Sequence, residues 1–220
     1  MSYLPSLTKT TAERGVSLGF AAIDSLQAPL LPREAVAVSK AAPKRQREFT
    51  AGRTLARALI ADAGEPRPIA QNADRSPRWP AGIVGSISHS DEFCAAAIAP
   101  SSASLSLGLD IETVGKVKRE LWPLLFVATE LAALERESDP AAQALLATLM
   151  FSAKEALYKL QHPLTKAWAE FHIAEVERTS ASTFRIEHGI SHPKIPRTLQ
   201  GEFGLATPDT LLCLLLLPTS

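Results

Sequence analysis

The stretch "SLSLGLDIETVGK", Ser104–Lys116, has the alternation of a β-strand that ends in acidic residues. Its apolar positions are Leu105, Leu107, Leu109 and Ile111, and the positions between them are small or polar. A period of two is typical of a half-buried strand. Asp110 and Glu112 end the polar side, and residues two apart on a strand point the same way, roughly 7 Å from each other.

This acidic pair has two interpretations. Two carboxylates brought to about 5 Å repel by about 3 kcal/mol at an effective dielectric of about 20. A cation relieves that repulsion, and Mg²⁺ commonly takes one or two carboxylates together with phosphate oxygens. The alternative is a solvated strand end, where water screens the charges. The strand alone leaves both interpretations open.

The segment "MFSAKEALYKL", Met150–Leu160, has the spacing of an amphipathic helix. Its core stripe is Met150, Ala153, Leu157 and Leu160. Ser152, Glu155 and Lys159 share the opposite face, and Lys154 lies to the side with Tyr158. On spacing alone, Glu155 and Lys159 form a surface pair that is worth a few tenths of a kcal/mol. Alternatively, Glu155 is a third metal ligand and the two lysines neutralise phosphate.

Composition and charge limit the classes of protein. The chain has 220 residues, 46% of them hydrophobic, and equal numbers of Lys+Arg and Asp+Glu, 23 each. This is enough for a real core, and the neutral balance favours neither a nucleic-acid nor a membrane partner. Cys94 and Cys213 lie in apolar runs, which predicts buried free thiols and a reducing cytoplasm. The N-terminal "MSYLPSLTKTTAERG" lacks the apolar region of a signal peptide, and the apolar run 211–217 is too short to span a bilayer.

Positive charge is nevertheless concentrated locally. From Lys40 to Arg57 there are six cationic residues against Glu48 alone. Such a segment indicates a polyanionic partner, either nucleic acid or a multiply phosphorylated small molecule. The segment "WPAGIVGSISHS", residues 79–90, adds small residues, hydroxyls and His89, a combination suited to phosphate or to a plain strand and turn.

The predicted element order is helices, a sheet, helices and another sheet, which indicates an α+β fold of two subdomains, 1–107 and 108–220. Helices are expected over 44–63, with Gly64 as the stop, and over 122–136 and 141–161. Strands are expected over 16–23, 83–88, 93–99, 105–111, 172–177, 183–188, 199–205 and 210–217.

Together these motifs resemble those of the Sfp-type 4′-phosphopantetheinyl transferases. Within that family they are most like the branch of the enterobactin-synthase component EntD. The strand end Gly108-Leu109-Asp110-Ile111-Glu112 matches that family's Gly-x-Asp-Ile/Val-Glu motif. Phe151–Lys159 matches its Phe/Trp-Ser-x-Lys-Glu-x-x-x-Lys helix. "REFTAGRTLARALI", "WPAGIVGSISHS" and "FVATELAAL" resemble further segments, so the resemblance covers roughly residues 44–159.

The resemblance implies a fold of two similar α/β subdomains related by a pseudo-two-fold axis. It also implies transfer of the 4′-phosphopantetheine arm of coenzyme A to a serine of an apo acyl or peptidyl carrier protein, with release of adenosine 3′,5′-bisphosphate. Asp110, Glu112 and Glu155 would hold Mg²⁺ against the coenzyme A diphosphate. Glu130 would take the serine proton, and Lys154 and Lys159 would contact phosphate oxygens. The implied catalytic residues are therefore Glu130, Glu155 and Lys159.

Coenzyme A would bind the basic segment, which then needs no nucleic acid to explain it. The resemblance gives each of these side chains an expected contact: Ser88 and His89 with the phosphates, Arg45 and Arg53 with the 3′-phosphate, and Arg75 and Arg78 near the adenine.

Two alternatives to this enzyme stay open. One is a Mg²⁺-dependent phosphohydrolase that acts on coenzyme A or nucleotides with water as the nucleophile. The other is a coenzyme A- or carrier-binding protein without catalysis. The expected enzyme is a cytoplasmic monomer, and the sequence leaves open whether its carrier serves fatty acid, polyketide, siderophore or other nonribosomal peptide synthesis.

Overall fold

The computed structural model describes residues 13–61 and 67–219, and it confirms a mixed fold of helices and sheets. A three-stranded antiparallel sheet has the order β1-β5-β4, and a five-stranded one has the order β6-β10-β9-β8-β7. Their strands are β1 Ser17–Ala22, β4 Ile83–His89, β5 Phe93–Pro100, β6 Ser104–Thr113, β7 Ala174–Arg178, β8 Thr183–His188, β9 Thr198–Thr207 and β10 Thr210–Pro218.

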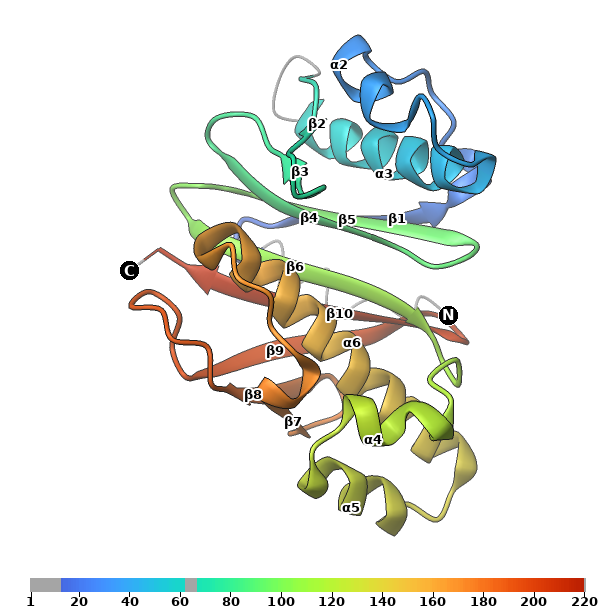
Figure 1. Cartoon of the computed structure of the whole chain (residues 1–220), viewed down its shortest axis with the longest axis vertical. Coiled ribbons are helices and arrows are strands. Elements are labelled where there is room, and N and C mark those ends of the chain that lie inside the picture. The colour runs from blue at the N-terminus through green and yellow to red at the C-terminus, as the bar shows by residue number, and fades with distance from the viewer. Residues whose placement is uncertain (1–12, 62–66, 220) are drawn as a thin grey trace.

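Two long helices cover the outer faces of these sheets (Figure 1). Helix α3, Pro43–Ala61, packs on the three-stranded sheet, and α6, Pro140–Thr165, packs on the five-stranded sheet. The shorter elements are η1 Ile23–Ser25, α2 Pro32–Ala35, η2 Val36–Val38, β2 Ala70–Gln71, β3 Pro77–Arg78, η3 Arg119–Leu121, α4 Trp122–Leu125, α5 Ala128–Arg136 and η4 Phe171–Ile173.

Both sides of strand β6 are covered, one by the three-stranded sheet and the other by α6, so the prediction of a half-buried strand is wrong. Its leucine side, including Leu107 and Leu109, packs against the alanines of β5. The other side, with Ser106 and Gly108, is also buried, because α6 lies directly on it. A Cβ on Gly108 would stand 1.8 Å from the carbonyl oxygen of Ala156. Small residues thus allow the helix to approach the strand backbone.

Most of the predicted elements are confirmed, with one helix divided. The predicted helix over 122–136 is interrupted at Phe126 and Val127, which have extended backbone between α4 and α5. Phe126 is 1% exposed, so burial of its ring accompanies the break. The expected end of the first long helix at 63, and its Gly64 stop, lie outside the described residues.

The predicted division of the chain at 107/108 falls inside β6. This strand pairs with β10 along its whole length, from Ser104 to Thr113. Division by sheet would separate β5 from β6 instead. The two-subdomain boundary and the pseudo-two-fold axis stay predictions.

The burial of both cysteines agrees with expectation. Cys94 and Cys213 are both buried and free, as their apolar surroundings predicted. Burial raises the pKa of the Cys94 thiol to about 12, which leaves it unreactive near neutral pH. In the part of the chain that the structure describes, no helix combines the length and apolar character needed to cross a membrane.

Candidate functional site

A buried carboxylate on β6 is the centre of the site. Asp110 is 2% exposed, and its Oδ1 accepts from the Ser88 hydroxyl at 2.8 Å and from Lys159 Nζ at 2.6 Å. Its Oδ2 accepts from the Ser152 hydroxyl at 2.8 Å. Lys159 Nζ also donates to the Ser88 hydroxyl oxygen at 2.9 Å. The structure therefore brings together β4, β6 and α6, three segments far apart in the sequence.

Local geometry explains why these side chains meet. Ser152 and Lys159 are seven residues apart on α6, which is nearly two helical turns, so both face β6. Gly108 allows that face to lie close to the strand. Of the two interpretations of Lys159, a surface partner of Glu155 or a residue of the site, the second describes its contacts better, because its ammonium group bonds to Asp110 and Ser88.

Two more carboxylates share the electrostatic field of Asp110. The pKa of Glu112 is raised to about 7, first by burial and then by repulsion from Asp110, with Lys159 opposing the shift. The pKa of Glu155 is also raised, first by burial, with repulsion from Asp110 added. Burial and repulsion from Asp110 therefore favour the protonated, uncharged form of both groups more than water does. Within residues 13–61 and 67–219, no three Asp, Glu, His or Cys side chains are arranged so that they could hold a metal ion.

Glu130 and Lys154 lie elsewhere, in the protein interior. Their side chains are 1% and 2% exposed and pair with each other at 2.6 Å. Glu130 also accepts two backbone N–H groups, so both of its carboxylate oxygens are engaged. This environment suits a structural ion pair better than a base open to a serine hydroxyl, or a lysine that reaches a phosphate. The expected roles of base for Glu130 and phosphate ligand for Lys154 stay predictions.

The basic segment brings Arg45 and His89 together. Arg45 Nη1 lies 3.0 Å from His89 Nε2, and Glu48 lies 3.6 Å from the same imidazole nitrogen. The pKa of His89 is lowered, mainly by burial, with the charges of Arg45 and Lys159 adding to the shift. A neutral imidazole that accepts from Arg45 fits this arrangement.

Arg53, which was expected to contact the 3′-phosphate of coenzyme A, is buried and bonded to other parts of the protein. It is 4% exposed, its Nε donates to the Ile69 carbonyl at 2.7 Å, and its guanidinium stacks on the Phe49 ring at 4.2 Å. Burial lowers its pKa to about 10, so it remains cationic at neutral pH. Arg53 thus anchors the segment before β2 while adding positive charge near Arg45.

Arg75 borders a cavity beside Lys159. It has a φ of 65° in the turn between β2 and β3. The cavity is about 300 Å³ and lies between β3, β4 and the end of α6, and residues that line it are Arg75, Trp79, Ser86, Tyr158, Lys159 and His162. Arg78 is exposed on β3 and is not among the residues that line this cavity.

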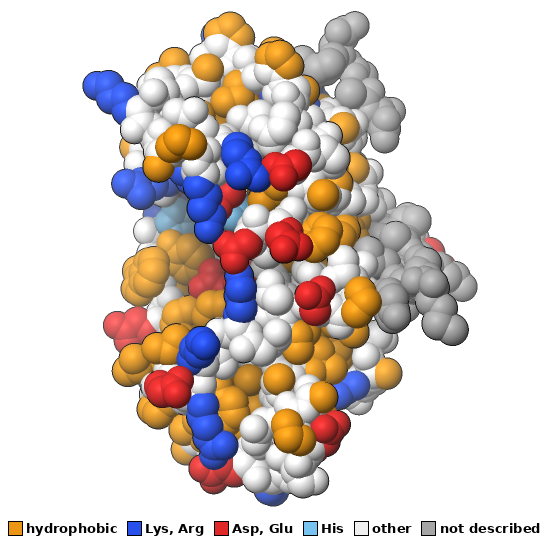
Figure 2. Space-filling view, turned by 90° about the vertical axis from the view of Figure 1, so that its right-hand side faces the viewer, with side chains coloured by type: hydrophobic (Ala, Val, Ile, Leu, Met, Phe, Trp, Pro, Cys, Tyr) orange, Lys and Arg blue, Asp and Glu red, His pale blue; other side chains and the backbone are white. Residues whose placement is uncertain are grey.

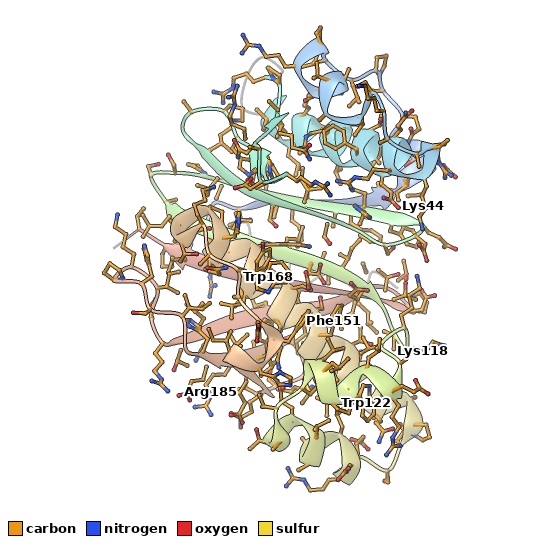
Figure 3. The ribbon with its side chains drawn as sticks, viewed as in Figure 1. Lys44, Lys118, Trp122, Phe151, Trp168 and Arg185 are labelled. Carbon is orange, nitrogen blue, oxygen red and sulfur yellow. The ribbon has the colours of Figure 1, made fainter. Side chains whose placement is uncertain are left out.

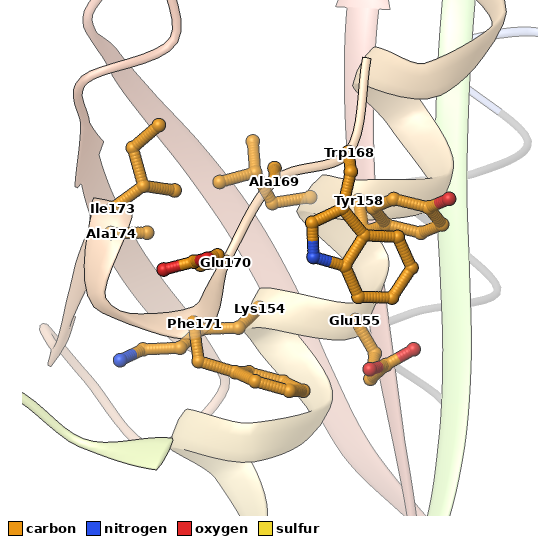
Figure 4. Close-up of a pocket in the computed structure, with 10 residues that line it drawn as sticks. Lys154, Glu155, Tyr158, Trp168, Ala169, Glu170, Phe171, Ile173 and Ala174 are labelled. Carbon is orange, nitrogen blue, oxygen red and sulfur yellow. The ribbon is translucent and has the colours of Figure 1, made fainter. Parts of the chain in front are cut away.

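An aromatic pocket borders the other side of the site (Figure 4). It measures about 70 Å³ and is lined in part by Glu155, Tyr158, Trp168 and Phe171. The Tyr158 and Trp168 ring centroids are 5.1 Å apart, and Trp168 is 75% exposed. The family motifs end at Lys159 and predicted no site residue beyond it. The aromatic residues of "KAWAEFHI", residues 166–173, are the signal that could have found this pocket.

Charged side chains of both signs lie across the face between the two layers. Figure 2 shows Lys, Arg, Asp and Glu side chains alternating there, around a histidine in a hollow. Asp91 pairs with Lys44 of α3 at 2.9 Å and with Lys116, which follows β6. Figure 3 shows Lys44 on the upper layer, Phe151 on α6 and Trp168 in the segment that follows α6.

Family models match both halves of the chain. The 4'-phosphopantetheinyl transferase N-terminal domain matches residues 32–99, and the 4'-phosphopantetheinyl transferase superfamily model matches residues 106–207. The chain belongs to this family of transferases, which confirms the resemblance found in its motifs.

Curated relatives bear the same name. The chain is 35% identical to 4'-phosphopantetheinyl transferase Npt of Nocardia iowensis, over 72% of this chain and 68% of the relative. It is 32% identical to 4'-phosphopantetheinyl transferase PptT of Mycobacterium tuberculosis, over 70% of this chain and 67% of the relative. The chain is 36% identical to Enterobactin synthase component D of Salmonella typhi, over 53% of this chain and 48% of the relative, in agreement with the expected branch.

Proposed function

We propose that this enzyme transfers the 4′-phosphopantetheine group of coenzyme A to a serine hydroxyl of an apo carrier protein and releases adenosine 3′,5′-bisphosphate. The observation that supports it most directly is the Asp110–Lys159–Ser88 cluster, with Glu112 and Glu155 in its field, at the junction of β4, β6 and α6. Excess carboxylate beside a lysine suits a site for a diphosphate and a cation.

The reaction is a displacement at phosphorus. The serine oxygen forms a bond to the phosphorus that bears pantetheine, and the bridging P–O bond of the diphosphate breaks. The bridging oxygen leaves with the bond's electron pair on adenosine 3′,5′-bisphosphate, while the serine proton passes to water. Such a reaction needs mainly positioning and neutralised charge. Lys159 would supply positive charge to the diphosphate oxygens.

The acidic residues fit Mg²⁺ in their chemistry. Repulsion from Asp110 contributes to the raised pKa of both Glu112 and Glu155, so a divalent cation would relieve a charge imbalance that the fold creates. Asp110, Glu112 and Glu155 would supply the oxygen ligands, and their side chains would have to come closer together than in this structure, where no three of the described acidic side chains are arranged to hold a metal ion. When bound, it would polarise the diphosphate and offset charge on the leaving group.

The two cavities suit the two ends of coenzyme A. The cavity beside Arg75, with the tryptophan ring of Trp79, would take the adenine end, and Arg45 and Arg53 would face the 3′-phosphate. His89 and Ser88 would contact the diphosphate. The aromatic pocket beside Glu155, about 70 Å³, would contact only part of the pantetheine arm, which is largely uncharged.

Intact-protein mass spectrometry tests the proposal. The enzyme is incubated with coenzyme A, Mg²⁺ and a panel of apo carrier proteins from different biosynthetic systems, and at least one carrier should gain the mass of the phosphopantetheine arm. Asp110→Asn should abolish transfer. Asp91→Asn, which changes an exposed carboxylate, is the matched control and should retain it.

Two results would favour another function. Release of adenosine 3′,5′-bisphosphate without a carrier would indicate the phosphohydrolase alternative. Binding of coenzyme A without release, in the presence of every carrier, would indicate a binding protein. Because all of the named side chains come from one chain, we also propose that a monomer is sufficient.

A further inference from the structure

A buried carboxylate in the layer of α3 holds the residue that precedes β2. Glu34 of α2 is 0% exposed and forms an ion pair with Arg57 of α3. Its Oε1 accepts from the Ile69 N–H at 2.9 Å, and its Oε2 also accepts from the Leu31 N–H at 3.0 Å. Arg57 donates in addition to the Pro29 carbonyl at 3.1 Å. One carboxylate thus joins α2, α3 and the start of β2, which lies beside α3 (Figure 1).

Ile69 is held through both of its backbone polar groups. Its N–H donates to Glu34, and its carbonyl accepts from Arg53 Nε at 2.7 Å. Both peptide units that meet at the Ile69 Cα are therefore fixed, and with them the direction in which the chain enters β2. Ile69 is 0% exposed, so water cannot easily replace the carboxylate as the partner of its N–H.

The β2–β3 hairpin that follows forms one wall of the cavity beside Lys159. Only two residue pairs join its strands, Ala70 with Arg78 and Gln71 with Pro77. A two-stranded hairpin is at best marginally stable alone, so its place depends on what anchors it. Its turn is anchored by an exposed ion pair of Asp74 and Lys166, 3.2 Å apart, and such pairs contribute little. The buried anchor at Ile69 is therefore the stronger one. The turn residues that line the cavity are Asn72, Asp74, Arg75 and Ser76.

We propose that Glu34 is a positioning residue for the nucleotide end of coenzyme A. By holding Ile69, it fixes the hairpin wall that carries Arg75 and so sets the shape of the cavity beside Lys159. This inference rests on the proposed function, which assigns the cavity to that end of the substrate. Glu34 is not among the described residues that line the cavity, so it acts through the backbone of residues 69–78.

Two double variants separate the hydrogen-bond acceptor from the ion pair. Glu34→Gln/Arg57→Met keeps a side-chain oxygen for the Ile69 N–H, whereas Glu34→Met/Arg57→Met removes it. Neither variant leaves a buried charge without its partner, which is the costly case. The affinity for adenosine 3′,5′-bisphosphate is measured by isothermal titration calorimetry, without carrier protein or turnover. We expect its Kd to rise at least fivefold in Glu34→Met/Arg57→Met and less than twofold in Glu34→Gln/Arg57→Met.

Steady-state kinetics distinguish positioning from a merely structural role. The KM for coenzyme A should rise at least fivefold in Glu34→Met/Arg57→Met with kcat within twofold of native, because the residues at the reacting phosphorus lie on β4, β6 and α6. A structural role would lower the fraction of folded enzyme, which reduces kcat and leaves KM unchanged. Glu34→Asp keeps the charge opposite Arg57 but withdraws the carboxylate by one methylene group, so it should fold and raise the Kd at least twofold. Circular dichroism and thermal unfolding establish that each variant is folded.

Several outcomes would overturn the inference. A native Kd in folded Glu34→Asp or Glu34→Met/Arg57→Met would show that Glu34 does not shape the cavity. An equal rise in both double variants would assign the effect to the ion pair instead of the bond to Ile69. Lack of adenosine 3′,5′-bisphosphate binding by the native protein would remove the nucleotide from the cavity. Failure of the native enzyme to modify any carrier, with the Kd changes as expected, would instead contradict the proposed transfer alone, because the titration contains no carrier.

Discussion

Gly108→Ala is the change that most directly tests the packing of the site. A Cβ at this position would lie 1.8 Å from the Ala156 carbonyl oxygen, whereas ordinary contacts begin at 3.4 Å. Helix α6 would have to move away from β6 by more than 1 Å, because backbone atoms lie on both sides of the contact. Lys159 and Ser152 move with the helix, while Asp110 stays on the strand.

The magnitudes follow from this displacement. Overpacking of a well-packed interior costs about 1–3 kcal/mol. For a chain of this size, that corresponds to a fall of about 2–12 °C in Tm. The hydrogen bonds from Ser152 and Lys159 to Asp110, 2.8 and 2.6 Å long, would be broken or stretched. A shift of about 1 Å in a catalytic group can reduce the rate by about 10²-fold.

The assay compares thermal unfolding with the rate of carrier modification. Ser106→Ala is the matched control, since it lies on the same side of β6 and adds no bulk. It removes the hydrogen bond from the Ser106 hydroxyl to the Leu160 carbonyl, 2.6 Å long, and should cost about 1 kcal/mol with little loss of rate. If Gly108→Ala retained the native Tm and rate, α6 would not be seated on β6 as described.

Three other changes test the charges and the pockets. Glu112 has an ordinary pKa of 4.5 in the unfolded chain and a pKa of about 7 in the folded one. Its contribution to the stability of the fold is therefore present below pH 4.5 and is lost as pH rises through 7. Without metal, the Tm of Glu112→Gln should exceed the native Tm by a margin that grows from about pH 5 to about pH 8, and a constant margin would contradict this. Arg45→Ala should raise the KM for coenzyme A about tenfold, equivalent to about 1.4 kcal/mol, but should change the KM for dephospho-coenzyme A little; equal increases would mean that Arg45 does not contact the 3′-phosphate. Trp168→Ala should also raise the KM for coenzyme A with a Tm within 2 °C of native, because its ring is 75% exposed, and an unchanged KM would remove the pantetheine arm from this pocket.

Local pattern was sufficient for most of the secondary structure. Alternation over 83–111 and over 183–217 predicted the strands of both sheets, and helical spacing predicted α6 with its buried stripe. The interruption at Phe126 was missed, because the apolar spacing continues through it while the backbone does not. The motifs also predicted the family, since Gly-x-Asp-x-Glu and the Lys-Glu helix are short stretches whose order is visible in the chain.

What the chain alone determined is which residues carry charge and which elements they occupy. Tertiary structure decided which of those residues meet. Asp110 and Lys159 are in contact because the small residues glycine and serine on β6 allow α6 to approach. The polar side of β6 is therefore buried under the helix rather than exposed to water. Glu130 and Lys154, by contrast, are enclosed together in the interior. Whether a charged side chain faces substrate or another side chain depends on packing between segments far apart in sequence, and no local pattern encodes that packing.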